Sequence, residues 1–77
     1  MNTIHTLTKY YSSGKVETLV TGSIQDCQSE LSQYKYLARK NGADIESEDE
    51  TSMVCVDYAG VGVDVTFNIT DTYEELL

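Results

Sequence analysis

The sequence predicts one α+β domain over residues 1–77, in which a four-stranded antiparallel sheet carries one helix on one face, in the order ββαββ. Segments rich in β-branched and aromatic residues lie on both sides of a single segment whose apolar residues recur at steps of three and four. The chain has 77 residues, which suits a single domain, and 40% of them are hydrophobic, which suits a folded one. Short connections favour antiparallel pairing of consecutive strands.

Residues 3–11 and 16–21 are predicted to form the first hairpin, because both are rich in threonine, tyrosine and β-branched residues and a turn containing Gly14 lies between them. A tight turn sets two apolar pairs opposite each other, Tyr11 with Val16 and Leu7 with Val20. Lys9 and Thr18 interrupt that apolar face. We therefore expect this hairpin to be half buried or to carry a bulge.

The helix is predicted over residues 24–40. Ser23 is a favourable N-cap, and Asp26 follows it at the spacing of a short capping box. Asn41-Gly42 is typical of a helix end, with Gly42 in the left-handed conformation. The stripe expected to cover the sheet consists of Ile24, Cys27, Leu31, Tyr34 and Ala38, with Leu37 beside it.

The second half of the chain contains two further predicted strands, residues 52–58 and 63–69. Residues 43–51 are interpreted as either a loop or a solvent-exposed strand, and residues 70–77 as a short helical turn. A two-residue turn at 60–61 predicts three apolar cross-strand pairs, namely Tyr58 with Val63, Val56 with Val65, and Val54 with Phe67.

The charges are divided unequally along the chain. Residues 1–41 hold all five Lys and Arg residues and three acids, which gives a net charge of +2. Residues 42–77 hold ten acids and no base, a net charge of −10, and the whole chain carries −8. An asymmetry of this kind bears on the partners of a protein rather than on its fold.

The acidic half contains the candidate binding residues. Four acids alternate from Asp44 to Glu50, so on an extended strand they would point the same way, about 6.6–6.8 Å apart. The predicted register also sets Asp57 opposite Asp64, a like-charge pair that a cation or a partner's Lys or Arg would neutralise. Tyr36 lies off the buried stripe, and exposed tyrosine is enriched at interfaces. The candidate partner-binding residues are Asp44, Glu46, Glu48, Asp49, Glu50, Asp57, Asp64 and Tyr36.

Three interpretations of these acids remain open: a solvated surface, an acidic face that engages a basic protein surface in competition with nucleic acid, and a divalent-cation site at Asp57 and Asp64. Two carboxylates fall short of the roughly six to eight oxygens that calcium takes. The sequence has no phosphate loop, dinucleotide fingerprint, HExxH or CxxC motif, and His5 is its only histidine. We therefore expect no cofactor, no metal and no catalytic residue.

In its size, its ββαββ pattern, its base-free half from Asp44 to Glu75 and the strand that follows Met1, the chain resembles the small acidic anti-defence proteins of phages and mobile elements, the anti-CRISPR type in particular. The resemblance implies an inhibitor that occupies a Lys- and Arg-lined nucleic-acid channel of an effector complex and excludes target DNA. The bases of the first half, Lys9, Lys15, Lys35, Arg39 and Lys40, confine any such mimicry to one face.

The sequence thus favours a non-enzymatic acidic binding protein that docks on a basic surface of a nucleic-acid-binding complex, without direct nucleic-acid or membrane contact. The absence of a basic and apolar leader favours the cytoplasm, that of the host cell if a phage encodes the chain. Cys27 and Cys55 are expected to be buried free thiols, with a single disulfide or a metal contact as the alternatives. Two alternatives stay open: a homodimer formed through the outward sheet face or a strand edge with Tyr10, Met53 and Cys55, and a minimal metal-dependent enzyme that uses Asp57, Asp64 or His5.

Overall fold

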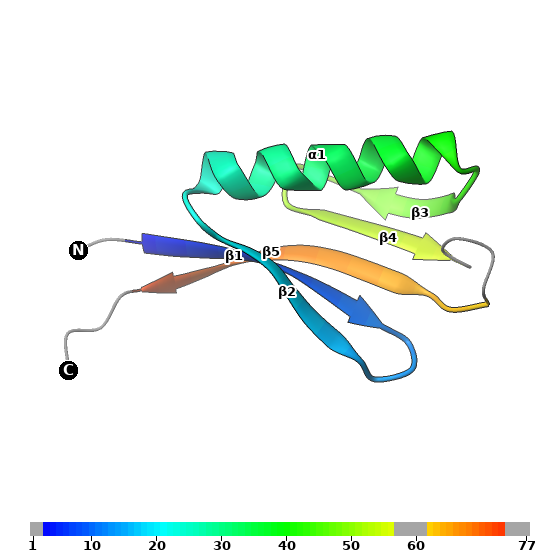
Figure 1. The fold of residues 1–77 in the computed structure, drawn as a ribbon, viewed down its shortest axis with the longest axis horizontal. Helices are drawn as coiled ribbons and strands as arrows, with labels where there is room; N and C mark the ends of the chain where they lie inside the picture. Colours follow the sequence, from blue (N-terminus) through cyan, green and yellow to red (C-terminus); the bar gives the residue numbers. More distant parts are fainter. Residues whose placement is uncertain (1–2, 57–61, 74–77) are drawn as a thin grey trace.

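The computed structural model describes residues 3–56 and 62–73, and in these ranges one helix lies along one side of an antiparallel sheet (Figure 1). The elements in chain order are β1 (Thr3–Tyr11), β2 (Val16–Gly22), α1 (Ile24–Lys40), β3 (Asp44–Glu48), β4 (Ser52–Val56) and β5 (Val65–Tyr73). The predicted α+β class and the single helix on one face are confirmed. The described sheet has five strands, so the predicted four-stranded ββαββ order is wrong by one strand.

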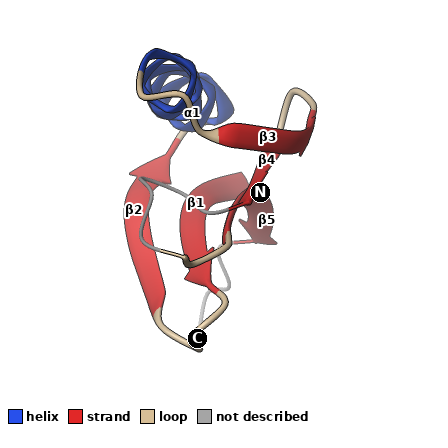
Figure 2. Ribbon diagram, turned by 90° about the vertical axis from the view of Figure 1, so that its right-hand side faces the viewer, coloured by secondary structure: helices blue, strands red, loops and turns tan. Residues whose placement is uncertain are grey.

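The strands lie in the order β2-β1-β5-β4-β3, and every neighbouring pair is antiparallel. The first and last strands therefore pair in the middle of the sheet. Because β2 and β3 form opposite edges, α1 must cross the sheet to connect them, and it covers one face as it does so (Figure 2).

The additional strand is β3, in the segment for which the sequence left loop and strand open. Its Ile45 packs against the core, whereas its other side chains are exposed. One apolar residue among acids is too short a pattern to predict a strand. Pairing with β4 supplies the missing stabilisation, because it satisfies backbone groups that a loop would leave to water.

The helical turn predicted for residues 70–77 is wrong for residues 70–73, which continue β5. Thr70 pairs with Thr6, Asp71 with His5, and Tyr73 with Thr3. A long β1 provides a hydrogen-bonding partner for each of these residues, and this tertiary pairing overrides the local capping pattern. Residues 74–77 lie outside the described ranges.

The register of β4 against β5 differs from the predicted one by one residue. Cys55 pairs with Val65 and Met53 pairs with Phe67, whereas Val54 was expected opposite Phe67. A shift of one residue exchanges the two faces of a strand. The apolar pattern did not reveal the error because Met53-Val54-Cys55-Val56 is apolar in both alternations. The predicted pairs of Val54 and Val56 are therefore wrong, and the pair of Tyr58 lies outside the described residues.

The first hairpin combines one confirmed pair with a bulge. Leu7 pairs with Val20 as predicted, but Tyr10, rather than Tyr11, pairs with Val16, because the register shifts between Leu7 and Thr8. The extra residue in β2 is Leu19. The interrupting Lys9 is accommodated by its aromatic neighbours, since its Nζ lies 4.8 Å from the ring centroid of Tyr11 and 5.5 Å from that of Phe67.

The helix has the predicted bounds and the predicted caps. The Ser23 Oγ accepts a hydrogen bond of 3.1 Å from the Asp26 backbone N–H, and Gly42 follows the helix with a φ of 74°. The amide of Ala43 donates to the Ala38 carbonyl at 2.8 Å, which satisfies one of the last helical acceptors. In the described ranges, no helix is long and apolar enough to cross a membrane.

The core lies between α1 and the facing side of the sheet. Its buried members are Leu7, Cys27, Leu31, Ala38, Met53, Cys55, Val65, Phe67 and Ile69. Phe67 is the largest of these, is fully shielded from solvent, and has its ring centroid 5.0 Å from that of Tyr34. Tyr34 belongs to α1 and Phe67 to the central strand, so this aromatic pair joins the two layers.

We expect Phe67→Ala to lower the free energy of unfolding by about 3–5 kcal/mol, because it removes buried surface and leaves a cavity. A domain of this size has little more stability than that, so the variant should be largely unfolded at room temperature. Urea unfolding followed by circular dichroism measures the change. The matched control is Tyr36→Ala, since the Tyr36 residue is 64% exposed and its truncation should change stability by less than about 1 kcal/mol. Equal effects of the two variants would contradict the assignment of the core.

Candidate acidic interface

The candidate binding acids of the sequence lie mainly on the edge strand β3 and the turn that follows it. The prediction that they form one row on one face is wrong. Asp44 pairs with Val56, Ser47 with Val54 and Glu48 with Met53, and the register shifts between Ile45 and Ser47. Because Met53 faces the core, Glu48 projects to the helix side of the sheet, whereas Asp44 projects to the opposite side. The bulge at Glu46 breaks the alternation that the row requires.

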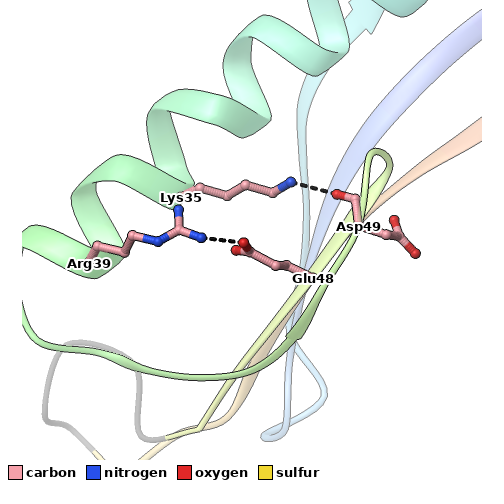
Figure 3. Close-up of polar contacts among 4 residues, drawn as sticks. All are labelled: Lys35, Arg39, Glu48 and Asp49. Atoms are coloured by element: carbon pink, nitrogen blue, oxygen red, sulfur yellow. Dashed lines mark hydrogen bonds and ion pairs between the residues drawn. The ribbon is translucent and has the colours of Figure 1, made fainter.

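Glu48 and Asp49 are bound by the helix. The Arg39 guanidinium forms an ion pair with the Glu48 carboxylate, and the Lys35 Nζ donates to the Asp49 backbone carbonyl at 2.5 Å (Figure 3). Lys35 and Arg39 are four residues apart, so they project from the same side of α1 toward the turn. One acid of the second half, Glu48, is therefore neutralised by a base of the first half, and a second base binds the backbone of the turn. The sequence signal for this contact between α1 and the turn is the spacing of Lys35 and Arg39, two bases four residues apart beside the buried stripe.

The side chain of Asp49 organises the β3–β4 turn. Its Oδ1 accepts hydrogen bonds from the Thr51 backbone N–H at 2.8 Å, from the Thr51 hydroxyl at 3.2 Å and from the Ser52 hydroxyl at 3.0 Å. These bonds favour the ionised carboxylate, and that from the Thr51 amide contributes most to lowering the pKa of Asp49 below its usual value of 3.8. The role that this geometry indicates for the Asp49 side chain is to stabilise the conformation of the turn.

Three of the candidate acids are exposed, and their carboxylates form no hydrogen bond or ion pair within the described residues: Asp44, Glu46 and Glu50. Asp44 lies at the start of β3, Glu46 at its bulge, and Glu50 in the turn after it. They follow the outer edge of the sheet, and the turn that carries Glu50 is fixed by the contacts of Glu48 and Asp49. This group of three acids is called the acidic edge below.

The other candidates lie elsewhere. The backbone of Asp64 is hydrogen-bonded to Ser12, with its N–H donating to the hydroxyl and its carbonyl accepting from the amide, so Asp64 lies beside the β1–β2 turn. Asp57 lies outside the described residues, and with it the predicted Asp57–Asp64 pair. Tyr36 is 64% exposed and lines a shallow hollow on the solvent side of α1 with Ser29, Ser32, Gln33 and Leu37.

The sequence also named residues for a homodimer interface and for a minimal metal-dependent enzyme, and the structure places most of them. Met53 and Cys55 are fully buried in the core, so the prediction that they form an outward dimer surface with Tyr10 is wrong. Cys27 and Cys55 are buried free thiols as expected, and burial raises the pKa of both. The His5 Nε2 lies 3.0 Å from the Asp71 carboxylate. Within the described residues, no three His, Cys, Asp or Glu side chains are grouped as metal ligands.

Comparison of the chain with protein-family models, with curated proteins and with solved structures finds no match. The geometry of the described residues therefore carries the functional inference by itself.

The ion pair of Arg39 and Glu48 should contribute about 0.2–1 kcal/mol to stability, because both side chains are partly exposed and solvent screens their attraction. A double-mutant cycle of Arg39→Ala and Glu48→Ala, measured by urea unfolding, isolates this energy. The control cycle combines Lys40→Ala with Glu48→Ala, because Lys40 also lies in the last helical turn. A coupling energy of zero between Arg39 and Glu48, or an equal one in the control cycle, would refute the tie between α1 and the turn.

The contribution of Asp49 should depend on pH. Its folded-state pKa is lowered, so the ionised carboxylate stabilises the fold fully above the usual pKa of 3.8, and this stabilisation is lost as the pH falls through the lower folded-state value. We expect Asp49→Asn to be less stable than the unmodified protein at neutral pH, with a gap that closes below pH about 4. Urea unfolding at several pH values tests this expectation. A gap that stays constant down to the lowest pH, or one matched by Glu50→Gln, would contradict the proposed role.

Proposed function

We propose that the protein is a non-enzymatic binding protein that docks its acidic edge on a Lys- and Arg-rich surface of another protein. The observation that carries this proposal is the state of three carboxylates. Asp44, Glu46 and Glu50 are exposed and without an ionic partner in the described residues, although two bases of α1 lie close to the same strand and turn. Lys35 and Arg39 bind the turn and Glu48 instead.

The structural setting of these carboxylates suits recognition better than a flexible acidic segment would. β3 is hydrogen-bonded to β4, and the turn after it is anchored by Asp49 and by the two bases of the helix. Because the backbone that carries these carboxylates is already ordered, less conformational entropy is lost when a partner binds them. Their common sign steers association with a basic surface and makes that association sensitive to salt.

The partner we propose is a nucleic-acid-binding complex, and in its most specific form a host-defence effector such as a CRISPR–Cas complex. A surface that binds the phosphate backbone presents several Lys and Arg side chains, which is the complement of the acidic edge. Occupation of that surface would exclude the nucleic acid, so the protein would act as a competitive inhibitor. The small size and the net charge of −8 support this form of the proposal.

We expect the triple variant Asp44→Asn, Glu46→Gln and Glu50→Gln to bind the partner at least about tenfold more weakly, because it removes three interfacial charges. The matched control is Ser29→Lys, Ser32→Lys and Gln33→Lys, three exposed helix positions. Both triple variants change the net charge by the same amount, so only position distinguishes them. The measurement is capture of proteins from a lysate of the source cell on the immobilised chain, followed by elution with salt and, separately, with duplex DNA.

The proposal requires that a captured complex be released by salt and by DNA, that the acidic-edge variant capture less of it, and that the helix variant capture it as the unmodified protein does. Equal loss in both variants would indicate a general effect of net charge. Undiminished capture by the acidic-edge variant would place the binding surface elsewhere. No DNA-displaceable capture at all would leave the acids as a solvated surface and refute the proposal.

A further inference from the structure

The sheet face opposite α1 is built from cross-strand rows of uncharged side chains. One row crosses all five strands and consists of Ser47, Val54, Thr66, Tyr10 and Val16. The next rows are Ser52, Asn68, Thr8 and Thr18, and then Thr70, Thr6 and Thr21. Each member alternates along its strand with a residue of the helix side, so these rows lie on the face away from α1. They are called the threonine face below.

The threonine face carries almost none of the charge of the molecule. Among the described residues, the ionisable acids and bases on this side of the sheet, apart from Tyr10, are Asp44 and Asp64, both at its margin beyond the row of Ser47 and Thr66. The other described acids and bases lie on the helix side, on α1 or in turns and bulges. A protein with a net charge of −8 therefore has one broad surface that another acidic body can approach without opposing carboxylates.

We propose that the threonine face binds a second copy of this chain, in a symmetric dimer that packs the two sheets face to face. A two-fold interface requires a patch that complements itself. Hydroxyl groups meet this requirement because each of them both donates and accepts hydrogen bonds. Valine and threonine at the same positions add apolar surface, and their branched side chains have little rotamer freedom to lose on binding.

Charge argues for a second copy through this face rather than through the β3 edge. At the β3 edge, pairing of two copies would bring the carboxylates of Asp44 and Glu46 against their own images. Charged edge strands of this kind are a known protection against edge-to-edge association. Face-to-face packing instead leaves the acidic edges at the periphery of the dimer, in contact with water.

The area suits a weak dimer. Strands about 4.8 Å apart and same-face residues about 6.7 Å apart give each residue about 32 Å², so the twelve residues of the threonine face cover roughly 400 Å² per copy. Two copies would then bury roughly 800 Å², which is the size of a weak, concentration-dependent interface. Thr8, at the centre of β1, is already only 8% exposed without any helix above it. The middle of the face therefore adds little area, and contact with a second copy would fall mainly on more exposed members of the face such as Tyr10 and Val16.

The central position for a test is Thr66, because it lies on the middle strand and in the row that crosses all five. Thr66→Lys would bury an unpaired ammonium group in the interface, so we expect the dimer dissociation constant to rise about 100-fold or more. Ser32→Lys, on the exposed side of α1, is the matched control with the same change in net charge. Because both variants lower the net negative charge, general electrostatics would strengthen association in both, whereas the proposed interface is broken in only one.

Sedimentation velocity from about 1 µM to about 1 mM measures the association. The proposal expects a concentration-dependent dimer for the unmodified chain and for Ser32→Lys, and a monomer for Thr66→Lys. Tyr10→Lys, at a 40% exposed position in the same row, should give the same result if Thr66→Lys does not fold. Added salt should strengthen the dimer by screening the like charges of the two copies, whereas it should weaken binding of a basic partner.

A monomer at every concentration, or a dimer that persists in both Thr66→Lys and Tyr10→Lys, would overturn the proposal. The triple variant of the acidic edge should dimerise at least as tightly as the unmodified chain, because its replaced carboxylates lie at the margin and the periphery. Failure of the dimer is therefore distinguishable from failure of partner binding.

Discussion

The pairing of β1 with β5 holds the rest of the structure in place. These strands are paired along all nine residues of each, from Thr3 with Tyr73 to Tyr11 with Val65. Without this ladder, the chain would consist of one hairpin and one three-stranded meander, each with an unprotected edge and half a core. With it, Leu7 of β1 and Phe67 and Ile69 of β5 face the same helix, and a single core forms. The two ends of the described chain meet there, so the contact with the longest sequence separation is also central to the sheet.

That central pairing also determines where the charges lie. With β1 and β5 in the middle, β2 and β3 become the edges, and α1 has to cross the sheet between them. The last turns of the helix then come to lie beside the β3–β4 turn, where Lys35 and Arg39 meet Asp49 and Glu48. The uneven division of charge along the sequence is thus partly reversed in space. Among the acids of β3 and the β3–β4 turn, Asp44, Glu46 and Glu50 remain exposed without an ionic partner in the described residues.

The helix could be predicted from the sequence because its signals are local. The N-cap at Ser23, the periodic stripe and the stop at Gly42 all lie within or next to the helix they define. The register of the strands depends on partners that are distant in the sequence. The prediction was wrong where those partners determine which side chains face the core. Met53 to Val56 is apolar on both alternations, so only the packing against β5 selects Met53 and Cys55 for the core. The bulge at Glu46 likewise arises in the pairing with β4, and it changes a predicted row of four carboxylates into an edge of three. The charge count along the sequence located the acidic segment but did not show which of its carboxylates the helix would bind.

The two proposed surfaces follow from the same small size. A chain of 77 residues has one helix, and one helix covers one face of a five-stranded sheet, so the second face and both edges are left to solvent or to partners. In an acidic protein, charged side chains can keep an uncovered sheet face soluble. Here the acidic edge lies along β3 and its turn, and the uncovered face is lined mainly with uncharged side chains such as threonine. Charge on the edge prevents copies from adding strand to strand, while a neutral, rigid face permits them to stack. In a stacked pair each copy would present its acidic edge at the rim of the dimer, so a basic partner would meet a surface that self-association leaves free.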